Sequence, residues 1–216
     1  MSRSNTFRCL ELLGLFLGFP VALYFMRHDF RAWVIVTILV FATGCTIALV
    51  TDKTFDRRRL WNVAGLKKEL GRILLLLLVL TSVPVIYLAL TEPERLFAFP
   101  RRALVTWVFV MVLYPILSAY PQEIIFRTFF FHRYRELFKS ERMMIIASAL
   151  AFGLAHVFLA NWIAPVFATA GGLLFGWTYA RSQSTLAAGL EHALWGNVLF
   201  TTGLGWYFYA GSIGAN

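Results

Sequence analysis

The stretch that decides the fold is residues 73–90, ILLLLLVLTSVPVIYLAL, which contains no charged side chain. An apolar run of about 20 residues is long enough to cross the hydrocarbon core of a bilayer as a helix. A helix also satisfies its own backbone hydrogen bonds, which lipid cannot do. This stretch therefore predicts a membrane-spanning helix, with Pro84 inside it.

The rest of the chain has the same apolar character. Of its 216 residues, 59% are hydrophobic and only 14% are charged, whereas a soluble domain has about 25% charged residues. We expect an all-α fold, a polytopic transmembrane helix bundle of about seven spans. The first run lacks a small-residue cleavage site, so we interpret it as a retained span. The spans are predicted at residues 9–26, 32–51, 73–90, 103 to about 127, 143–160, 162–180 and 184–200.

The distribution of positive charge predicts the orientation of the bundle. The formal net charge is +9, and 15 of the 20 Lys and Arg residues fall on one side of the predicted spans, the side that holds the N-terminus. Cytoplasmic loops carry such an excess. We therefore expect a multi-pass integral membrane protein with a cytoplasmic N-terminus, located in the plasma (inner) membrane. The same bias accounts for the net charge, so no nucleic-acid partner is expected.

Polar residues in the late spans are the exception to this apolar pattern. Residues 121–127, PQEIIFR, place Glu123 and Arg127 four residues apart at membrane depth. A charge at the centre of a span costs roughly 2.5–3.5 kcal/mol on insertion scales, so such groups must pair, neutralise or line a wet cavity. The complete set is Gln122, Glu123, Arg127, His156, Glu191, His192 and Asn197.

These side chains can activate water for attack on a carbonyl. Glu123 is the candidate general base, and His156 would share or orient the water. His192 and Asn197 would donate hydrogen bonds to the developing oxyanion. No serine or cysteine has an obvious nucleophile setting. The alternative for Glu123 and Arg127 is a purely structural ion pair at i, i+4 on one helix.

A metal site is the competing interpretation of the same residues. Glu123, His156 and His192 match the two-His, one-Glu ligand set of a catalytic zinc site. The chain has no His-Glu-x-x-His sequence, however, and if Glu123 bound zinc, Glu191 would have to supply the base. We therefore favour a site without a cofactor and keep zinc as the alternative.

Three short motifs carry a resemblance to a known family. They are Gln122-Glu123-x-x-x-Arg127, Phe152-x-x-x-His156, and His192 followed by Asn197. In this order on consecutive late spans, they resemble the CAAX prenyl endopeptidase-like intramembrane proteases, the CPBP or Abi family, whose motifs are Glu-Glu-x-x-x-Arg, Phe-x-x-x-His and His-x-x-x-Asn. This chain departs from that pattern in two places: Gln122 stands where the family has its first glutamate, and Gly196 stands four residues after His192.

The resemblance implies an intramembrane endopeptidase that cleaves near the C-terminus or membrane segment of a membrane-anchored or lipidated protein. It implies catalytic roles for Glu123, His156, His192 and Asn197, with Gln122, Arg127, Phe152 and Glu191 in support. Family members are described as glutamic proteases and as metalloproteases. The chain would then divide into three N-terminal spans with a basic cytoplasmic loop (1–102), a protease-like core (103–200) and a short tail (201–216).

Two other functions remain open. The first is a catalytically inactive binding or immunity protein of the same fold, which the glutamine at position 122 would favour. The second is a small transporter that uses Glu123 and Glu191 as proton sites, although no inverted repeat supports it.

Overall fold

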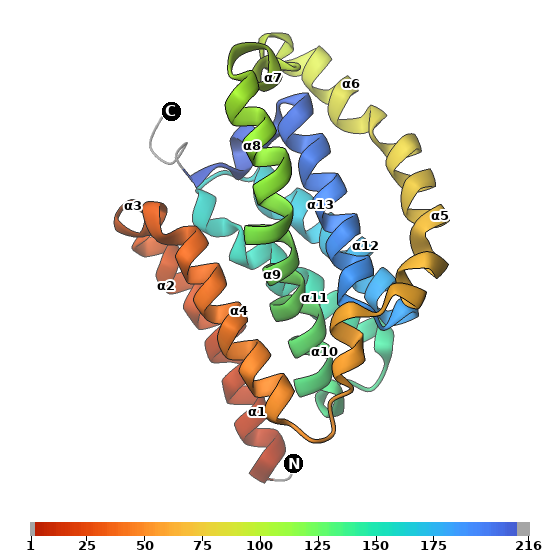
Figure 1. The fold of residues 1–216 in the computed structure, drawn as a ribbon. Helices are drawn as coiled ribbons and strands as arrows, with labels where there is room; N and C mark the ends of the chain where they lie inside the picture. The colour runs from red at the N-terminus through yellow and green to blue at the C-terminus, as the bar shows by residue number, and fades with distance from the viewer. Residues whose placement is uncertain (1–2, 211–216) are drawn as a thin grey trace.

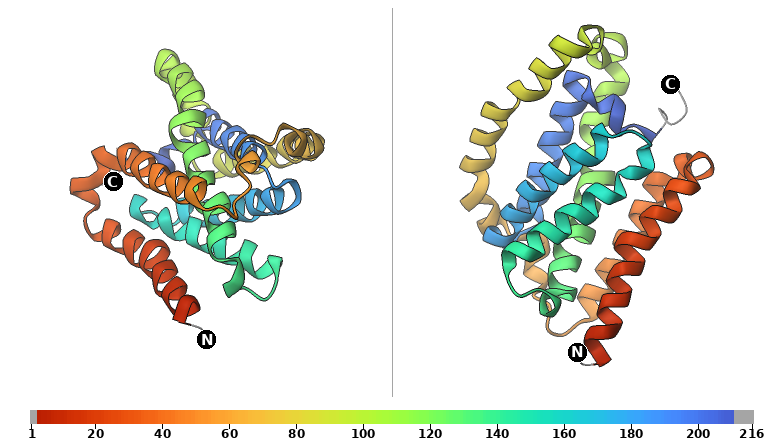
Figure 2. Two further views of the ribbon diagram at one scale, coloured as in Figure 1. Left: turned by 60° about the horizontal axis from the view of Figure 1, so that its bottom comes forward. Right: turned by 180° about the vertical axis from the view of Figure 1, so that it is seen from behind.

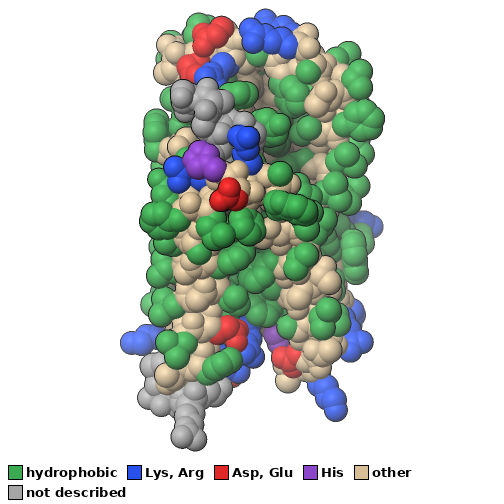
Figure 3. All heavy atoms as spheres, turned by 90° about the vertical axis from the view of Figure 1, so that its left-hand side faces the viewer, with side chains coloured by type: hydrophobic (Ala, Val, Ile, Leu, Met, Phe, Trp, Pro, Cys, Tyr) green, Lys and Arg blue, Asp and Glu red, His purple; other side chains and the backbone are tan. Residues whose placement is uncertain are grey.

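The computed structural model describes residues 3–210, which form helices and no strand. Six helical stretches are long and apolar enough to cross a membrane. The predicted all-α transmembrane bundle is therefore confirmed, and Figure 3 shows its apolar band between ends that carry Lys and Arg. The six stretches are Asn5–Phe25, Arg27–Thr51, Val63–Thr91, Leu104–Arg133, Glu141–Leu159 and Ile163–Ser182.

The seventh predicted span is a helix, α13 (Thr185–Thr202), but it is not one of the six. It carries Glu191, His192 and Asn197, and these polar residues lower its hydropathy. Beyond α13, a 3-10 helix covers Leu204–Phe208. The predicted tail thus begins inside α13, and its residues 211–216 lie outside the described residues.

The first two stretches form an arm beside the rest of the bundle (Figures 1 and 2). The arm begins with α1 (Arg3–Leu13), a π-helical turn (Gly14–Gly18) and α2 (Phe19–Phe25). It returns through α3 (Arg27–Phe30), a 3-10 turn (Arg31–Trp33) and α4 (Val34–Thr51). Phe16 anchors the arm to the core, because its ring packs edge-on against Phe126, Phe130 and Tyr134.

The basic segment 52–72, predicted either as an interfacial amphipathic helix or as a cytoplasmic loop, is partly helical. A 3-10 helix covers Arg57–Trp61, and α5 (Val63–Leu80) begins ten residues before the predicted span. Asn62 starts α5, because its side-chain oxygen accepts a hydrogen bond from the Gly65 backbone N–H at 3.0 Å. After α5 the chain bends into α6 (Ser82–Thr91), a 3-10 turn (Pro93–Arg95) and α7 (Ala98–Arg102).

The fourth stretch is an interrupted helix. It runs through α8 (Leu104–Tyr114), a π-helical turn (Pro115–Ala119), α9 (Tyr120–Glu123), a second π-helical turn (Ile124–Phe129) and α10 (Phe130–Arg133). Pro115 and Pro121 lack the backbone N–H that a regular helix would use. The short helix α9, which carries Gln122 and Glu123, therefore lies between two π-helical turns, a feature that is frequent at functional sites.

The last three long helices pack side by side around this interrupted helix (Figures 1 and 2). A 3-10 turn (Arg135–Leu137) leads into α11 (Glu141–Ala155), and another (Val157–Leu159) leads towards α12 (Ile163–Ser182). A Cβ atom at Gly172 would lie 2.9 Å from the Ala149 Cα atom. Glycine at this position therefore allows α12 to approach α11 closely.

Candidate active site

Glu123, Arg127 and His192 meet in the centre of the bundle. The Glu123 and Arg127 side chains have no exposed surface, and His192 is 5% exposed. His192 Nδ1 lies 2.9 Å from Glu123 Oε1, which joins α13 to α9. Arg127 Nε lies 3.1 Å from Glu123 Oε2, although the two groups are not aligned for a hydrogen bond. The carboxylate is thus held between a cation and an imidazole.

Aromatic rings hold Arg127 in place. Its guanidinium carbon lies 4.9 Å from the centre of the Phe152 ring and 5.7 Å from that of Phe175. Its Nη1 also donates a hydrogen bond to Ser148 Oγ at 3.2 Å. Cation–π contacts gain strength when the cation is desolvated. Phe152, the first residue of the second sequence motif, therefore supports the arginine of the first motif.

His192 has a defined orientation. Its ring stacks on Phe175, with centroids 4.7 Å apart and planes 16° apart, and meets the edge of Phe152. Since Nδ1 faces Glu123, the hydrogen-bond network assigns the Nδ1 proton to this contact and leaves Nε2 free to accept a proton. The His192 ring lines a cavity of about 260 Å³, called here the second cavity.

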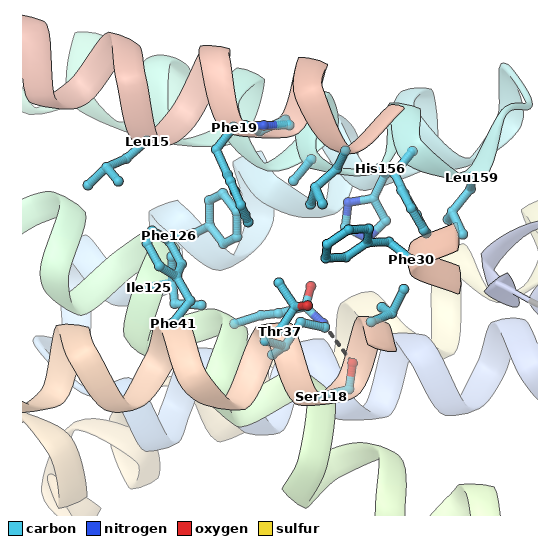
Figure 4. Close-up of a pocket in the computed structure, with 17 residues that line it drawn as sticks. Leu15, Phe19, Phe30, Thr37, Phe41, Ser118, Ile125, Phe126, His156 and Leu159 are labelled. Carbon is cyan, nitrogen blue, oxygen red and sulfur yellow. Dashed lines mark hydrogen bonds between the residues drawn. The ribbon is translucent and has the colours of Figure 1, made fainter. Parts of the chain in front are cut away.

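Two cavities meet at His156, Gln122 and Ser118. The first cavity, about 160 Å³, lies between the N-terminal arm and the core, and Figure 4 shows arm side chains pointing into it from both sides. His156, Gln122 and Ser118 line both cavities and form a shared wall. Gln122 Nε2 donates to Ser118 Oγ at 2.7 Å, and His156 Nδ1 lies 2.8 Å from the Phe152 carbonyl oxygen. Glu123 lines neither cavity.

Asn197 lies outside both cavities. Its Nδ2 donates to the Met111 carbonyl oxygen at 3.3 Å, which ties α13 to α8. Pro115, four residues after Met111, has no N–H to offer that carbonyl, and Asn197 supplies the missing donor. The amide that the sequence suggested as an oxyanion donor is therefore used in helix packing.

Glu191 also lies outside both cavities. Its carboxylate accepts a hydrogen bond from Thr178 and lies 3.4 Å from Arg72 Nη2. Arg72 also pairs with Glu69, and Glu69 pairs with Arg181. This charged cluster, named here the α5 cluster, joins α5, α12 and α13. The sequence prediction missed it because residues 52–72 were interpreted as an interfacial amphipathic helix or a loop, in either case without contacts to the late spans.

Two cavity residues, Ser118 and Tyr114, were also missed by the sequence prediction. Ser118 precedes Gln122 by four residues, so helical spacing alone could have placed it beside Gln122. Tyr114 lies at the end of α8 and lines the second cavity. Its sequence neighbourhood is apolar, and nothing in the sequence distinguishes it from an ordinary membrane tyrosine.

The residues of the zinc alternative do not fit a metal site in this arrangement. In residues 3–210, no group of three or more His, Cys, Asp or Glu side chains could hold a metal ion. The Glu123 carboxylate faces His192 Nδ1 and Arg127, while His156 Nδ1 faces a backbone carbonyl. Zinc coordination by Glu123, His156 and His192 would require these side chains to give up their present contacts.

Comparisons with known proteins support the resemblance suggested by the motifs. The profile of the type II CAAX prenyl endopeptidase Rce1-like family matches residues 103–209, which include Gln122, Glu123, Arg127, His156 and His192. No curated protein and no solved structure matches the chain. Residues 103–209 therefore form a type II CAAX prenyl endopeptidase Rce1-like family domain.

Proposed function

We propose that this chain is an intramembrane endopeptidase that cleaves a membrane-anchored or lipidated protein near its C-terminus or membrane segment. Its family is one of CAAX-type membrane proteases. The observation that carries the proposal is the contact of 2.9 Å between His192 Nδ1 and Glu123 Oε1, with the His192 ring in the wall of an apolar cavity. An imidazole that donates a hydrogen bond to a carboxylate in this way can act as a general base on a water molecule in the cavity.

In the proposed reaction, His192 rather than Glu123 takes the proton from water. Glu123 lines neither cavity, so its role is to accept the Nδ1–H hydrogen bond and to stabilise the imidazolium that forms. Arg127 lies beside the Glu123 carboxylate as its counterion. His156 and Gln122, in the shared wall, would position the water and the substrate backbone. None of these steps requires a metal ion or cofactor.

The apolar character of both cavities supports a substrate that lies in the bilayer. The first cavity is lined mainly by aliphatic and aromatic residues of four membrane-spanning stretches. Such a surface binds apolar chains and rejects hydrated peptides. We further propose that the N-terminus is cytoplasmic and that the membrane is the plasma (inner) membrane. Alkaline phosphatase fusions at Lys53 and Arg95, on opposite predicted sides, would test the orientation.

The test of the reaction uses purified chain in liposomes with peptides that carry a prenylated cysteine before three C-terminal residues. Mass spectrometry would detect the released tripeptide. We expect His192→Gln to lower the cleavage rate by about 10²–10⁴-fold, the usual contribution of a general base. His28→Gln, which changes an exposed histidine of α3, is the matched control and should leave the rate unchanged. Equal rates in both variants would refute this role of His192.

A second candidate function has one specific observation in its favour. Gln122, which cannot accept a proton, lies in the shared cavity wall where the family motif has a glutamate. The chain could therefore be an inactive relative that binds an apolar segment or acts as an immunity protein. Retained binding of the prenylated peptide without any cleavage by the unmodified chain would favour this candidate.

A further inference from the structure

Tyr114 lines the second cavity with a hydroxyl that has no assigned role, and the Trp195 indole N–H in the same wall is also without a partner among the described residues. Tyr114 ends α8 and lines the second cavity together with His192. Its ring meets the edge of the His192 ring, with centroids 5.9 Å apart and planes at 78°. Its hydroxyl makes no hydrogen bond within residues 3–210. A tyrosine hydroxyl enclosed by protein normally has a partner, so this hydroxyl has an unused donor beside the proposed base.

The absence of a side chain at Gly196 makes room for the Tyr114 ring. A Cβ atom at position 196 would lie 2.1 Å from Tyr114 Cε1 and 2.5 Å from both Cζ and Oη. No real side chain makes contacts this short, so the phenol occupies the space that any side chain at position 196 would need. Gly196 is one turn after His192 on α13. The Tyr114 hydroxyl therefore lies on the face of α13 that carries the proposed base.

Asn197, the expected oxyanion donor, is engaged with the Met111 carbonyl and lines neither cavity. Glu123 and Arg127 are enclosed behind His192. The second cavity therefore offers two donors that are unpartnered within residues 3–210, the Tyr114 hydroxyl and the Trp195 indole N–H, and the Tyr114 ring is the one that contacts the His192 ring. Attack of water on a carbonyl needs such a donor for the oxygen that becomes negative.

We propose that the Tyr114 hydroxyl donates a hydrogen bond to the carbonyl oxygen of the bound substrate and to the oxyanion formed from it. This role rests on the proposed peptidase function. The water oxygen bonds to the carbonyl carbon, the carbonyl π pair moves onto its oxygen, and the water proton passes to His192 Nε2. The carbon–nitrogen bond then breaks, and His192 returns the proton to the leaving amine. Tyr114 keeps its own proton throughout.

Tyr114→Phe tests the hydroxyl because it keeps the ring that packs against Gly196 and Phe200. We expect kcat for the prenylated peptide to fall about 10²–10³-fold, as for loss of one oxyanion donor, with KM changed less than threefold. Tyr87→Phe, on α6 and outside both cavities, is the matched control. Gly196→Ala, which must displace the phenol, should lower kcat as well.

A binding experiment tests Tyr114 without any turnover. The probe is 1,1,1-trifluorooctan-2-one, which is hydrated in water to a gem-diol that resembles the tetrahedral intermediate. Its affinity is measured by ¹⁹F NMR with the full chain in detergent, and 1,1,1-trifluorooctane is the control without oxygen. We expect Tyr114→Phe to weaken binding of the gem-diol about tenfold and to leave binding of trifluorooctane unchanged.

Several results would overturn the inference. These are equal binding of the gem-diol to both proteins, an equal loss of both probes in Tyr114→Phe, and no preference of the unmodified chain for the gem-diol over trifluorooctane. Cleavage at the normal rate by Tyr114→Phe, with cleavage lost in His192→Gln, would remove Tyr114 from the mechanism while the proposed function stands. Absence of cleavage by the unmodified chain would instead count against the proposed function.

Discussion

Glu123 and Glu191 are both buried carboxylates, yet their surroundings differ. Each side chain has no exposed surface, and Glu191 is the sequence neighbour of His192, to which Glu123 binds. Glu191 belongs to the α5 cluster, whose arginines reach the surface: the Arg72 side chain is 26% exposed and that of Arg181 is 50% exposed. The cation beside Glu123 is fully enclosed.

This difference separates a structural use of buried charge from a chemical one. The α5 cluster joins three helices, and its arginines keep exposed surface. Burying a complete ion pair costs much of what the pair gains, so the Glu123–Arg127 pair is a poor way to stabilise a bundle. Its position behind a cavity-lining imidazole fits the proposed role in proton transfer.

The largest effect should follow from neutralising Glu123. In Glu123→Gln, His192 loses the carboxylate that stabilises its protonated form, and Arg127 remains as a buried charge without a counterion. We expect kcat to fall about 10³–10⁴-fold and the free energy of unfolding to fall by about 3–5 kcal/mol. Peptide cleavage and denaturant unfolding in detergent would measure the two losses. A normal cleavage rate in a folded variant would contradict the assignment.

Neutralising Glu191 should lower the free energy of unfolding slightly and change kcat very little. In Glu191→Gln, Arg72 keeps Glu69 and Thr178 as partners, so we expect a loss of about 1–2 kcal/mol in unfolding free energy and less than a tenfold change in kcat. Glu94→Gln, at an exposed site in the turn after α6, is the control. If kcat instead fell as far as in Glu123→Gln, the α5 cluster would have to be part of the chemistry.

A carboxylate at position 122 would face the cavities, unlike the enclosed carboxylates of Glu123 and Glu191. Gln122→Glu places an acid in the shared cavity wall, where the Ser118 hydroxyl can turn to donate to it. A second proton acceptor facing the cavity should raise the cleavage rate about tenfold and add a new acid limb to its pH profile. An unchanged profile would show that position 122 does not contact the reacting water.

The smallest effect is expected from metal removal. Incubation with a chelator should leave the cleavage rate within about twofold, because the proposed proton transfers run through His192 alone. Elemental analysis of the purified chain would accompany the assay. Bound zinc, with activity that is lost on chelation and restored by zinc, would replace the mechanism proposed for Glu123 and His192.

The sequence predicted the fold well, because a span has to be apolar along its whole length. It also predicted the helix α13, although polar residues inside the bundle lower its hydropathy below that of the six spans. It placed the start of α5 too late, because α5 begins inside a segment rich in Lys and Arg. In both places, a helix depends on tertiary contacts: Asn62 caps α5 and also binds the Ser182 carbonyl at the end of α12.

The candidate site could be predicted in part of its membership but not in its geometry. The proximity of Glu123 and Arg127 follows from helix periodicity, and in the structure Arg127 Nε lies 3.1 Å from Glu123 Oε2. Which way each polar side chain faces depends on helix rotation, and the π-helical turns around α9 change that rotation locally. The sequence therefore could not show that Asn197 faces α8 or that Tyr114 faces His192.

The shared wall of Ser118, Gln122 and His156 has a consequence for inhibitor design. Within residues 3–210, only these three side chains line both apolar cavities. A linear molecule with an apolar group at each end and one amide between them would fill both cavities and replace the Gln122–Ser118 hydrogen bond with its own. Linking the two groups makes the second binding event intramolecular, so the affinity of such a molecule should far exceed that of either half.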